Sequence, residues 1–274
     1  MTDAEGIRFL QWCLPRLGLR WPGFRRVRRH VYKRIDRRLR DLGLPGVGAY
    51  RAHLEACPGE WVVLDALCWM PISRFCRDRG VFDYMARDVL PRLAMLAVAR
   101  GQECLRCWSV GCASGEEPYT LAILWKLGGE ARFPGLRFEI VATDIDPGAI
   151  ERARRAHYSA GSLRDLSTDA LSAAFVEDGA GYQLRDEFVT PVRFFVQDVR
   201  FAAPEAPFQL VLCRNVVFTY FDDQLQRRVL RTVRDRIPPG GALVIGATES
   251  LPEGEVGFES WSSKLRVFRR SEPG

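Results

Sequence analysis

The sequence has no apolar run that approaches the ~18–20 residues that a membrane-spanning helix needs. Its N-terminus, MTDAEGIRFLQW, lacks a basic stretch followed by an apolar one, so it does not indicate a secretory signal. We therefore expect a cytoplasmic protein with no membrane insertion. Low-complexity segments and internal repeats are also absent. The content of 47% hydrophobic and 27% charged residues excludes a disordered chain.

Histidine is scarce, and none of the three, His30, His53 and His157, lies in a recognised catalytic motif. We interpret them as structural, which leaves no histidine base for deprotonating an acceptor. Cys104 and Cys107 form a Cys-x-x-Cys pair without a second pair, so we expect core thiols and no metal site. Neither an Asn/Asp-Pro-Pro-Tyr motif nor a base-stacking run of aromatic residues occurs, which disfavours nucleic acid as a substrate.

The 274 residues fit one large domain with a smaller satellite, at ~100–200 residues per domain. Residues 1–95 show helical periodicity interrupted by prolines, and we expect a small helical N-terminal domain there. Its most distinctive segment, residues 24–42, carries apolar residues at spacings of three and four. Between Phe24 and Arg40 it also holds nine Lys or Arg residues against one acid, Asp36. This basic helix indicates either a solvated face or a surface for an acidic partner.

From residue 96 onward, apolar strands alternate with amphipathic helices. The segments LRCWSVG, FEIVATDID, VRFFVQDV, FQLVLCRNV, GGALVIGAT and KLRVFRR resemble strands, whereas PYTLAILWKL, PGAIERARRAH and DDQLQRRVLRTVRDRI resemble helices. This alternation predicts an α/β fold with a parallel, doubly wound, Rossmann-like sheet over residues 96–274. The stretch 158–190 interrupts the alternation, and we expect a hairpin around GAGYQLRDEF.

The loop after the first strand, Ser109 to Pro118, indicates a ligand site. Gly111 and other small residues allow a ligand to approach the backbone, and the helix that follows offers unpaired N–H groups. Glu116 and Glu117 lie at this turn and would repel a phosphate. They suit a ligand with a cationic amino or sulfonium group, although acids that favour a helix N-terminus are an alternative explanation.

Other polar residues stand where later strands end. Asp144 is placed to accept hydrogen bonds from ribose hydroxyls, whereas Asp146 before Pro147 is the better candidate for a helix cap. Asp198 is a candidate acceptor for an adenine amino group, and Arg214 with Asn215 ends another strand. Because strand carboxyl ends meet at one edge of such a sheet, these residues predict an adenosine ligand without phosphates. S-adenosylmethionine fits best.

Four segments resemble the CheR-type methyltransferase family, whose type member esterifies chemoreceptor glutamates. They are WSVGCASGEEPYTLA, ATDIDPGAIERAR, VRFFVQDV and the stretch from FQLVLCRNVVFTYFDD to GATES, and RRHVYKRIDRRLRDLGL resembles the helical domain of the family. The resemblance implies a class I methyltransferase sheet and S-adenosylmethionine as cofactor. It implies that Arg77 and Tyr220 lie near the transferred methyl group. The residues expected to contact or adjoin the cofactor are Ser73, Arg77, Gly111, Glu116, Glu117, Asp144, Asp198, Val199, Arg214 and Asn215.

The chain departs from the family pattern on the acceptor side. Pro71 replaces an Asn, Ser73 a Thr and Cys76 a Phe, and five residues instead of four lead from Asn215 to Tyr220. These changes lead us to expect a small-molecule acceptor. The alternative is a protein-glutamate O-methyltransferase that acts on chemoreceptor-like carboxylates of an acidic helix, and a non-catalytic sensor of S-adenosylmethionine is a third hypothesis. We predict no oligomeric state.

Overall fold

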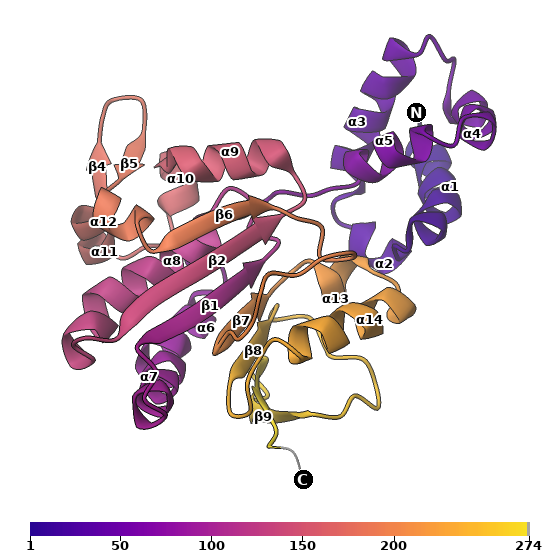
Figure 1. The fold of residues 1–274 in the computed structure, drawn as a ribbon. Coiled ribbons are helices and arrows are strands. Elements are labelled where there is room, and N and C mark those ends of the chain that lie inside the picture. The colour runs from indigo at the N-terminus through magenta and orange to yellow at the C-terminus, as the bar shows by residue number, and fades with distance from the viewer. Residues whose placement is uncertain (273–274) are drawn as a thin grey trace. The chain divides into compact units, whose positions relative to one another are not determined.

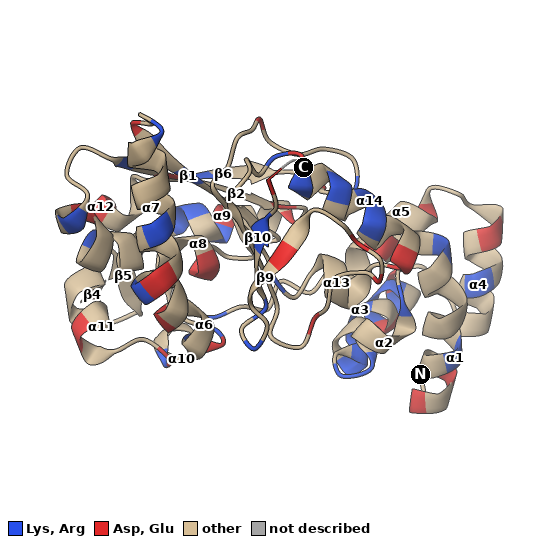
Figure 2. Ribbon diagram, turned by 90° about the horizontal axis from the view of Figure 1, so that it is seen from below, with Lys and Arg blue, Asp and Glu red and all other residues tan. Residues whose placement is uncertain are grey.

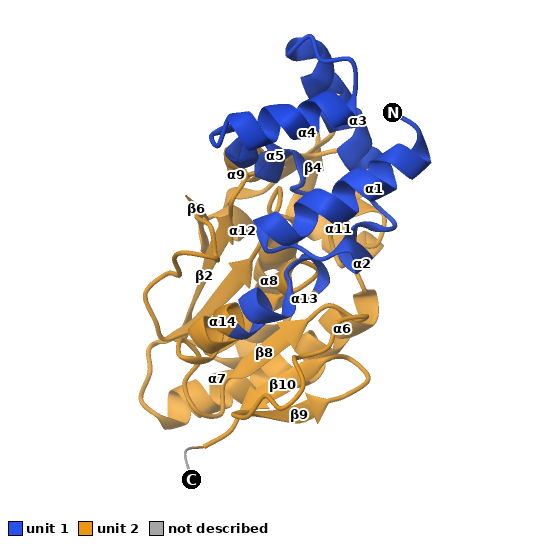
Figure 3. Cartoon of the chain, turned by 90° about the vertical axis from the view of Figure 1, so that its right-hand side faces the viewer, with its two compact units in different colours: residues 1–70, 219–227 blue, residues 71–218, 228–274 orange. Residues whose placement is uncertain are grey.

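The computed structural model describes residues 1–272, which form two compact units. Residues 1–70 and 219–227 make up unit 1, and residues 71–218 with those from 228 onward make up unit 2 (Figure 3). This division lies after Met70, whereas the sequence suggested a boundary after residue 95. The intervening helices belong to unit 2 because they pack on its first strand. No helix within residues 1–272 has the length and apolarity to cross a bilayer.

Unit 1 is helical, and its helices are α1 (Asp3–Cys13), α2 (Trp21–Phe24), α3 (Arg28–Asp41), α4 (Val47–Ala56) and α5 (Glu60–Leu67), with a 3-10 turn, η1 (Leu14–Leu17). The predicted basic helix is α3, and it begins four residues later than expected because α2 and a turn take up its start. Val31, Ile35 and Leu39 are buried at helical spacing. Gly43 follows with φ +65°, the left-handed conformation expected at a helix end.

A buried carboxylate, Glu60, joins three helices of unit 1. Its side chain accepts hydrogen bonds from the Arg38 guanidinium at 2.9 and 2.7 Å and from the Tyr50 hydroxyl at 2.8 Å. The hydrogen bond from Arg38 is the main reason why the pKa of Glu60 lies below its ordinary value. Because Glu60 is only 6% exposed, these partners replace the water that its charge has lost.

Unit 2 is built on a seven-stranded sheet with the order β6-β2-β1-β7-β8-β10-β9 (Figure 1). The strands are β1 (Cys104–Val110), β2 (Arg137–Asp144), β6 (Val192–Val196), β7 (Leu210–Cys213), β8 (Ala242–Ile245), β9 (Phe258–Ser262) and β10 (Val267–Arg270). The first five in sheet order are parallel, and β10 is antiparallel to both neighbours. The chain moves outward from β1 through β2 to β6 and then returns to the other side of β1. The predicted doubly wound sheet is thus confirmed.

The helical elements that begin in unit 2 are α6 (Arg79–Tyr84), η2 (Met85–Val89), α7 (Leu90–Ala99), α8 (Glu116–Leu124), η3 (Trp125–Gly129), η4 (Glu130–Arg132), α9 (Pro147–Arg155), α10 (Ala160–Leu163), α11 (Thr168–Ala174), α12 (Asp186–Val189) and α13 (Val217–Tyr220). α13 and α14 (Asp223–Arg234) cross the division between the units. α8, α9 and α14 match the three helical segments predicted after residue 96, and Asp146 caps α9 by accepting a hydrogen bond from the backbone N–H of Gly148 at 2.8 Å. The N-cap interpretation of Asp146 is confirmed.

A second sheet fills the stretch that interrupts the alternation. It has three short antiparallel strands in the order β3-β5-β4, which are β3 (His157–Tyr158), β4 (Phe175–Glu177) and β5 (Tyr182–Leu184). β4 and β5 form the expected hairpin. The sequence analysis missed β9, because its exposed strand residues carry no apolar run that would mark it.

We predict that Glu60→Gln lowers the free energy of unfolding of unit 1 by ~2–3 kcal/mol at neutral pH, since it breaks a buried, charge-assisted pair whose arginine is partly hydrated. Urea denaturation measures the change. Because the pKa of Glu60 is lowered in the folded state, its contribution is present above the ordinary glutamate pKa. That contribution is lost as the pH falls through the lowered value, so wild type and variant converge in acid.

The matched control is Glu55→Gln, which breaks the exposed Arg51–Glu55 pair of α4 and should change stability by less than ~0.5 kcal/mol. Equal effects of the two substitutions would show that the Glu60 cluster does not organise the unit.

Candidate active site

The candidate residues of unit 2 meet at one edge of its sheet. β6, β2, β1 and β7 are adjacent parallel strands, so the loops that follow them emerge on the same side. The chain reverses its direction of progress across the sheet between β1 and β7, which makes this edge a topological switch point. Residues 111–115, 198–199 and 214–215 lie in these loops, whereas Asp144 is the last residue of β2 and Glu116 the first of α8.

The loop after β1 is shaped by glycine. Gly111 has φ +69°, and a Cβ atom added there would overlap the Val216 side chain in the loop after β7. The glycine is therefore required both by its backbone conformation and by the close approach of the two loops. Two residues later, the backbone N–H of Ala113 donates to Asp144 at 2.8 Å, which joins this loop to the end of β2.

Asp144 and Glu116 are the buried carboxylates of this edge. Asp144 accepts hydrogen bonds from the backbone N–H groups of Ala113 and Asp146, at 2.8 and 2.9 Å. Glu116 accepts one bond from the Ser162 hydroxyl, at 3.4 Å, on Oε1, whereas its buried Oε2 has no partner among the described residues. Burial raises the pKa of both carboxyl groups. A buried carboxylate oxygen without a partner indicates a place for a ligand donor.

An open pocket of about 400 Å³ adjoins Glu116. Its walls come from the loop after β1, from α9 and from the segment after α9, and its lining residues are Ser114, Glu116, Arg152, Arg155, His157, Tyr158, Ser159 and Ser162. Arg152 also donates to the Ser114 hydroxyl at 3.1 Å, which ties α9 to the loop. Residues 1–272 contain no group of three or more His, Cys, Asp or Glu side chains that could hold a metal ion.

Asp198 differs from the other acids because Arg200 already pairs with it. The Arg200 guanidinium contacts both carboxylate oxygens, at 2.8 to 3.0 Å. The sequence suggested that this carboxylate accepts from an adenine amino group. In the structure, the Asp198 carboxylate would have to accept from an adenine amino group while it also pairs with Arg200. The adjacent Val199 lies in the same loop and is half-buried.

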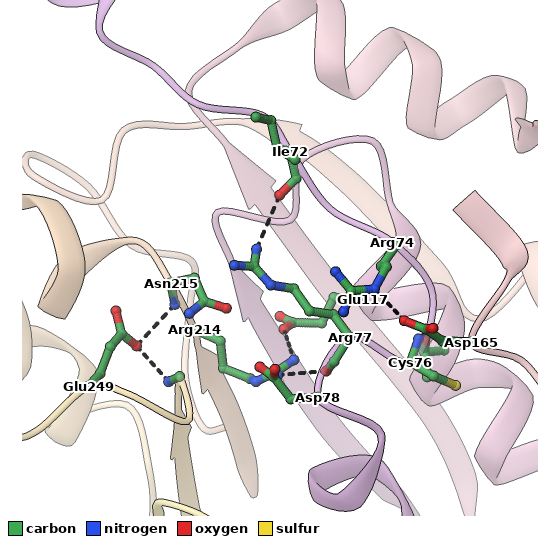
Figure 4. Close-up of polar contacts among 12 residues, drawn as sticks. Ile72, Arg74, Cys76, Arg77, Asp78, Glu117, Asp165, Arg214, Asn215 and Glu249 are labelled. Atoms are coloured by element: carbon green, nitrogen blue, oxygen red, sulfur yellow. Dashed lines mark hydrogen bonds and ion pairs between the residues drawn. The ribbon is translucent and has the colours of Figure 1, made fainter. Parts of the chain in front are cut away.

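Arg214 lies at the centre of a buried polar cluster (Figure 4). Its Nη1 donates to Glu117 at 3.0 Å, and its Nη2 donates to both the Asp78 carboxylate and the Arg77 carbonyl at 2.8 Å. The side chain is 2% exposed and stacks on the Phe82 ring. The sequence grouped Arg214 with cofactor contacts; in the structure its Nη1 and Nη2 bind protein groups, and its buried Nε has no partner among the described residues. Arg214 links the loops after β1 and β7 to the segment before α6.

The segment before α6, residues 71–78, presents Ser73 and Arg77. Cys76 and Asp78, on either side of Arg77, have φ +51° and +62°. Such left-handed conformations cost on the order of 1–3 kcal/mol each outside glycine. Contacts from the rest of unit 2 offset this cost: Thr120 accepts from the backbone N–H of Cys76 at 3.2 Å, and Arg214 binds Asp78. The Arg77 guanidinium donates to the Ile72 carbonyl at 3.2 Å (Figure 4).

Glu249, which the sequence analysis missed, holds the loop that carries Asn215. Its Oε2 accepts from the backbone N–H groups of Asn215 and Gly246, at 3.0 and 2.5 Å, and the residue is 3% exposed. Asn215 has φ +58° and therefore depends on this support. The signal was available: Glu249 follows a strand end, the same criterion that selected Asp144. Asp78 was missed because no strand precedes it.

Tyr220, the second predicted residue of the acceptor side, belongs to unit 1 rather than unit 2. Its ring lies against the buried Phe24, with ring centroids 5.0 Å apart. Its backbone carbonyl accepts from the N–H of Arg20 at 2.8 Å. All ten predicted cofactor residues, Arg77 among them, therefore belong to unit 2, whereas Tyr220 belongs to unit 1.

Comparison with known proteins identifies the family. The sequence model of the family described as "CheR methyltransferase, SAM binding domain" matches residues 72–267. The chain belongs to the CheR methyltransferase family. A "Chemotaxis protein methyltransferase" from Listeria innocua is 35% identical over 74% of this chain and 74% of its own length. One from Escherichia coli is 31% identical over 94% of this chain and 88% of its own length.

Two further similar proteins are, respectively, much longer than this chain and less similar to it in sequence. An "Uncharacterized 104.1 kDa protein" from Rhodobacter capsulatus is 32% identical over 89% of this chain, which spans only 25% of that protein. Among solved structures, CalS10, an amino pentose methyltransferase from Micromonospora echinaspora, is 20% identical. It has a TM-score of 0.36 over 70% of this chain and 65% of that one.

This CheR-family chain is an S-adenosylmethionine-dependent methyltransferase with a class I sheet. The residues at the sheet edge fit the cofactor: Glu116 offers an unpartnered carboxylate oxygen, and Asp144 has acceptor capacity beyond its two backbone bonds. Hydroxyl and ammonium donors match both. The bound cofactor supplies a methyl group on a sulfonium centre. The protein orients the reacting groups and excludes water, and the Arg214 cluster holds the loops of the site in place relative to one another.

We predict that Arg214→Lys weakens binding of S-adenosylhomocysteine about tenfold or more. A lysine cannot hold Glu117, Asp78 and the Arg77 carbonyl together, and loss of one charge-assisted hydrogen bond corresponds to ~1.5–3 kcal/mol. Isothermal titration calorimetry measures the affinity. The control is Arg236→Lys, at a partly buried arginine that binds the carbonyls of Pro204 and Thr232. Wild-type affinity in Arg214→Lys would contradict the positioning role.

Proposed function

We propose that this chain methylates carboxylate side chains of an acidic protein segment, forming glutamate methyl esters on a chemoreceptor-like acceptor. The relatives support this proposal better than the small-molecule acceptor that the altered acceptor side led us to expect. Proteins named chemotaxis protein methyltransferases from Escherichia coli and Salmonella typhimurium match 94% and 92% of this chain, and so match residues of both units.

The proposal rests on one observation: only some of the Lys and Arg side chains of residues 24–42 bind other groups of unit 1. Arg28, Arg34 and Arg38 serve unit 1 itself, since they bind Asp3, the carbonyls of Leu67 and Trp69, and Glu60. The remaining cations of the segment are exposed and form no ion pair or side-chain hydrogen bond with any residue of the described part of the chain; they are Arg25, Arg26, Arg29, Lys33, Arg37 and Arg40.

Four of these cations form a continuous surface on α3. Arg29, Lys33, Arg37 and Arg40, which we name the basic row, follow one another at spacings of four, four and three and so lie along one helical face. Figure 2 shows Lys and Arg positions of α3 in blue. Neighbouring cations without ion-pair partners repel one another, and binding of an acidic helix would relieve this repulsion. The row is therefore better explained by an anionic protein partner than by solvation alone.

The proposed chemistry places modest demands on the site. A carboxylate is already an anion at neutral pH, so it needs alignment rather than a base. We assign this alignment to Arg77, whose guanidinium can bind a carboxylate through two N–H groups, and to Tyr220. The absence of a histidine from the sequence motifs is consistent with an acceptor that needs no deprotonation.

We predict that methyl-labelled S-adenosylmethionine, incubated with the enzyme and a lysate of the source organism, labels protein. Mild alkali should release the label as methanol, because esters hydrolyse there and methyl–nitrogen bonds do not. A size filter separates labelled protein from labelled small molecules. Label in the low-mass fraction would support the small-molecule acceptor instead. No label, despite binding of S-adenosylhomocysteine, would favour the sensor.

Two triple charge-reversal variants test whether the basic row binds the acceptor. The triple variant Arg29→Glu, Lys33→Glu and Arg37→Glu should reduce protein labelling ~10-fold or more at low salt, and the difference should shrink as screening increases. The control reverses three exposed cations of unit 2, Arg87, Arg137 and Arg231, and changes the net charge equally. Equal losses in both variants would exclude the basic row as the acceptor surface.

A further inference from the structure

The segment that carries Tyr220 is held by one turn of unit 1, residues 18–24. The N–H of Arg20 donates to the Tyr220 carbonyl at 2.8 Å, and the Arg20 guanidinium donates to the Thr219 carbonyl at 3.2 Å. Leu19 forms a β-bridge with Phe221, and the N–H of Asp222 donates to the Gly18 carbonyl at 2.9 Å. Four consecutive residues, 219–222, are thus anchored to this turn.

Gly23 is the point of closest approach between the turn and the segment. A Cβ atom added at Gly23 would overlap the Thr219 carbonyl oxygen and lie 3.1 Å from Cδ1 of the Tyr220 ring. Gly23 lies in α2 and has no positive φ, so its backbone is one that any residue adopts. The glycine is therefore required by proximity to Thr219 and not by conformation.

The neighbouring residue, Phe24, completes the contact. It is 1% exposed, and its ring packs on the Tyr220 ring at a centroid distance of 5.0 Å. Aromatic pairs at this separation favour a defined relative orientation. Main-chain hydrogen bonds thus hold residues 219–222 against residues 18–20. The absence of a side chain at Gly23 allows the close contact with the Thr219 carbonyl, and the Phe24 ring orients the Tyr220 ring.

We propose that Gly23 and Phe24 are positioning residues for methyl transfer, which set the place of Tyr220 and accommodate the additional residue between Asn215 and Tyr220. Counted from Asn215, Tyr220 is the fifth residue, whereas the tyrosine of the family pattern is the fourth. Thr219, which directly precedes Tyr220, has its carbonyl against Gly23. This inference rests on the role that the proposed function gives Tyr220. It adds that the basic row and Tyr220 belong to one compact unit, so the unit that binds the acceptor also carries the tyrosine.

The test compares Gly23→Ala with Gly48→Ala. Both add one methyl group to a helix of unit 1, but nothing lies within 4 Å of a Cβ atom at Gly48. We expect Gly23→Ala to lower kcat on the protein acceptor on the order of 10- to 100-fold, as for an ~1 Å displacement of a catalytic group. The affinity for S-adenosylhomocysteine should stay close to wild type, and the melting temperature should fall by roughly a few degrees, because the added Cβ atom meets backbone atoms of Thr219. Gly48→Ala should resemble wild type throughout.

Two further variants make the result decisive. Tyr220→Phe measures the importance of the tyrosine directly; if it lowers kcat while Gly23→Ala does not, the positioning role is overturned and the proposed function stands. If Gly23→Ala does not fold, Phe24→Leu replaces it, since leucine keeps the site apolar and removes the ring contact. Wild-type kcat in a folded Phe24→Leu variant would likewise overturn the proposal.

A spectroscopic measurement separates this inference from the identity of the acceptor. The protein is labelled with 3-fluorotyrosine, and the Tyr220 resonance is assigned from its disappearance in Tyr220→Phe. We expect this ¹⁹F resonance to shift in Gly23→Ala and not in Gly48→Ala, whether or not the acceptor is a protein. An unchanged resonance would show that the turn does not set the position of Tyr220.

Discussion

The guanidinium of Arg214 is the interaction on which the arrangement of the site depends. It is buried, and it joins Glu117 after β1 to Asp78 and the Arg77 carbonyl before α6, while its own backbone continues β7. These three segments are far apart in the sequence. A buried cation remains in place only if its partners remain in place, so the cluster couples their positions. Arg77 then lies between two left-handed residues that the cluster and Thr120 hold.

A second buried charge also holds this part of the site. Glu249 accepts hydrogen bonds from the backbone N–H groups of Asn215 and Gly246 and so fixes the loop after β7. By contrast, Glu116 keeps one buried oxygen without a partner among the described residues. The acids that support the loops are therefore bonded to protein groups, although the buried Nε of Arg214 also has no partner in the described part of the chain. Among the carboxylates, this contrast indicates which ones position the loops and which one can receive a ligand donor.

Much of this was accessible from the sequence, and the limits have physical reasons. Apolar periodicity located α8, α9 and the parallel strands, and polar residues at strand ends located Asp144 and Asn215. The bonding partners were not accessible, because residue spacing does not show that Glu117 and Asp78 bind Arg214 or that Arg200 binds Asp198. The unit boundary after Met70 was not accessible either, and the sequence suggested one after residue 95 instead. Helices of the two units share one periodicity, and only packing assigns α6 and α7 to unit 2.

Mapping the methylated atom tests the proposed carboxylate methylation most directly. Protein acceptor treated with the enzyme and S-adenosylmethionine is digested and analysed by tandem mass spectrometry, with a parallel sample exposed to mild alkali. We expect one added methyl group on glutamate side chains within acidic, helix-forming peptides, absent after alkali and absent without enzyme. Methyl groups confined to nitrogen or sulfur atoms, or found only on small molecules, would contradict carboxylate methylation by this chain.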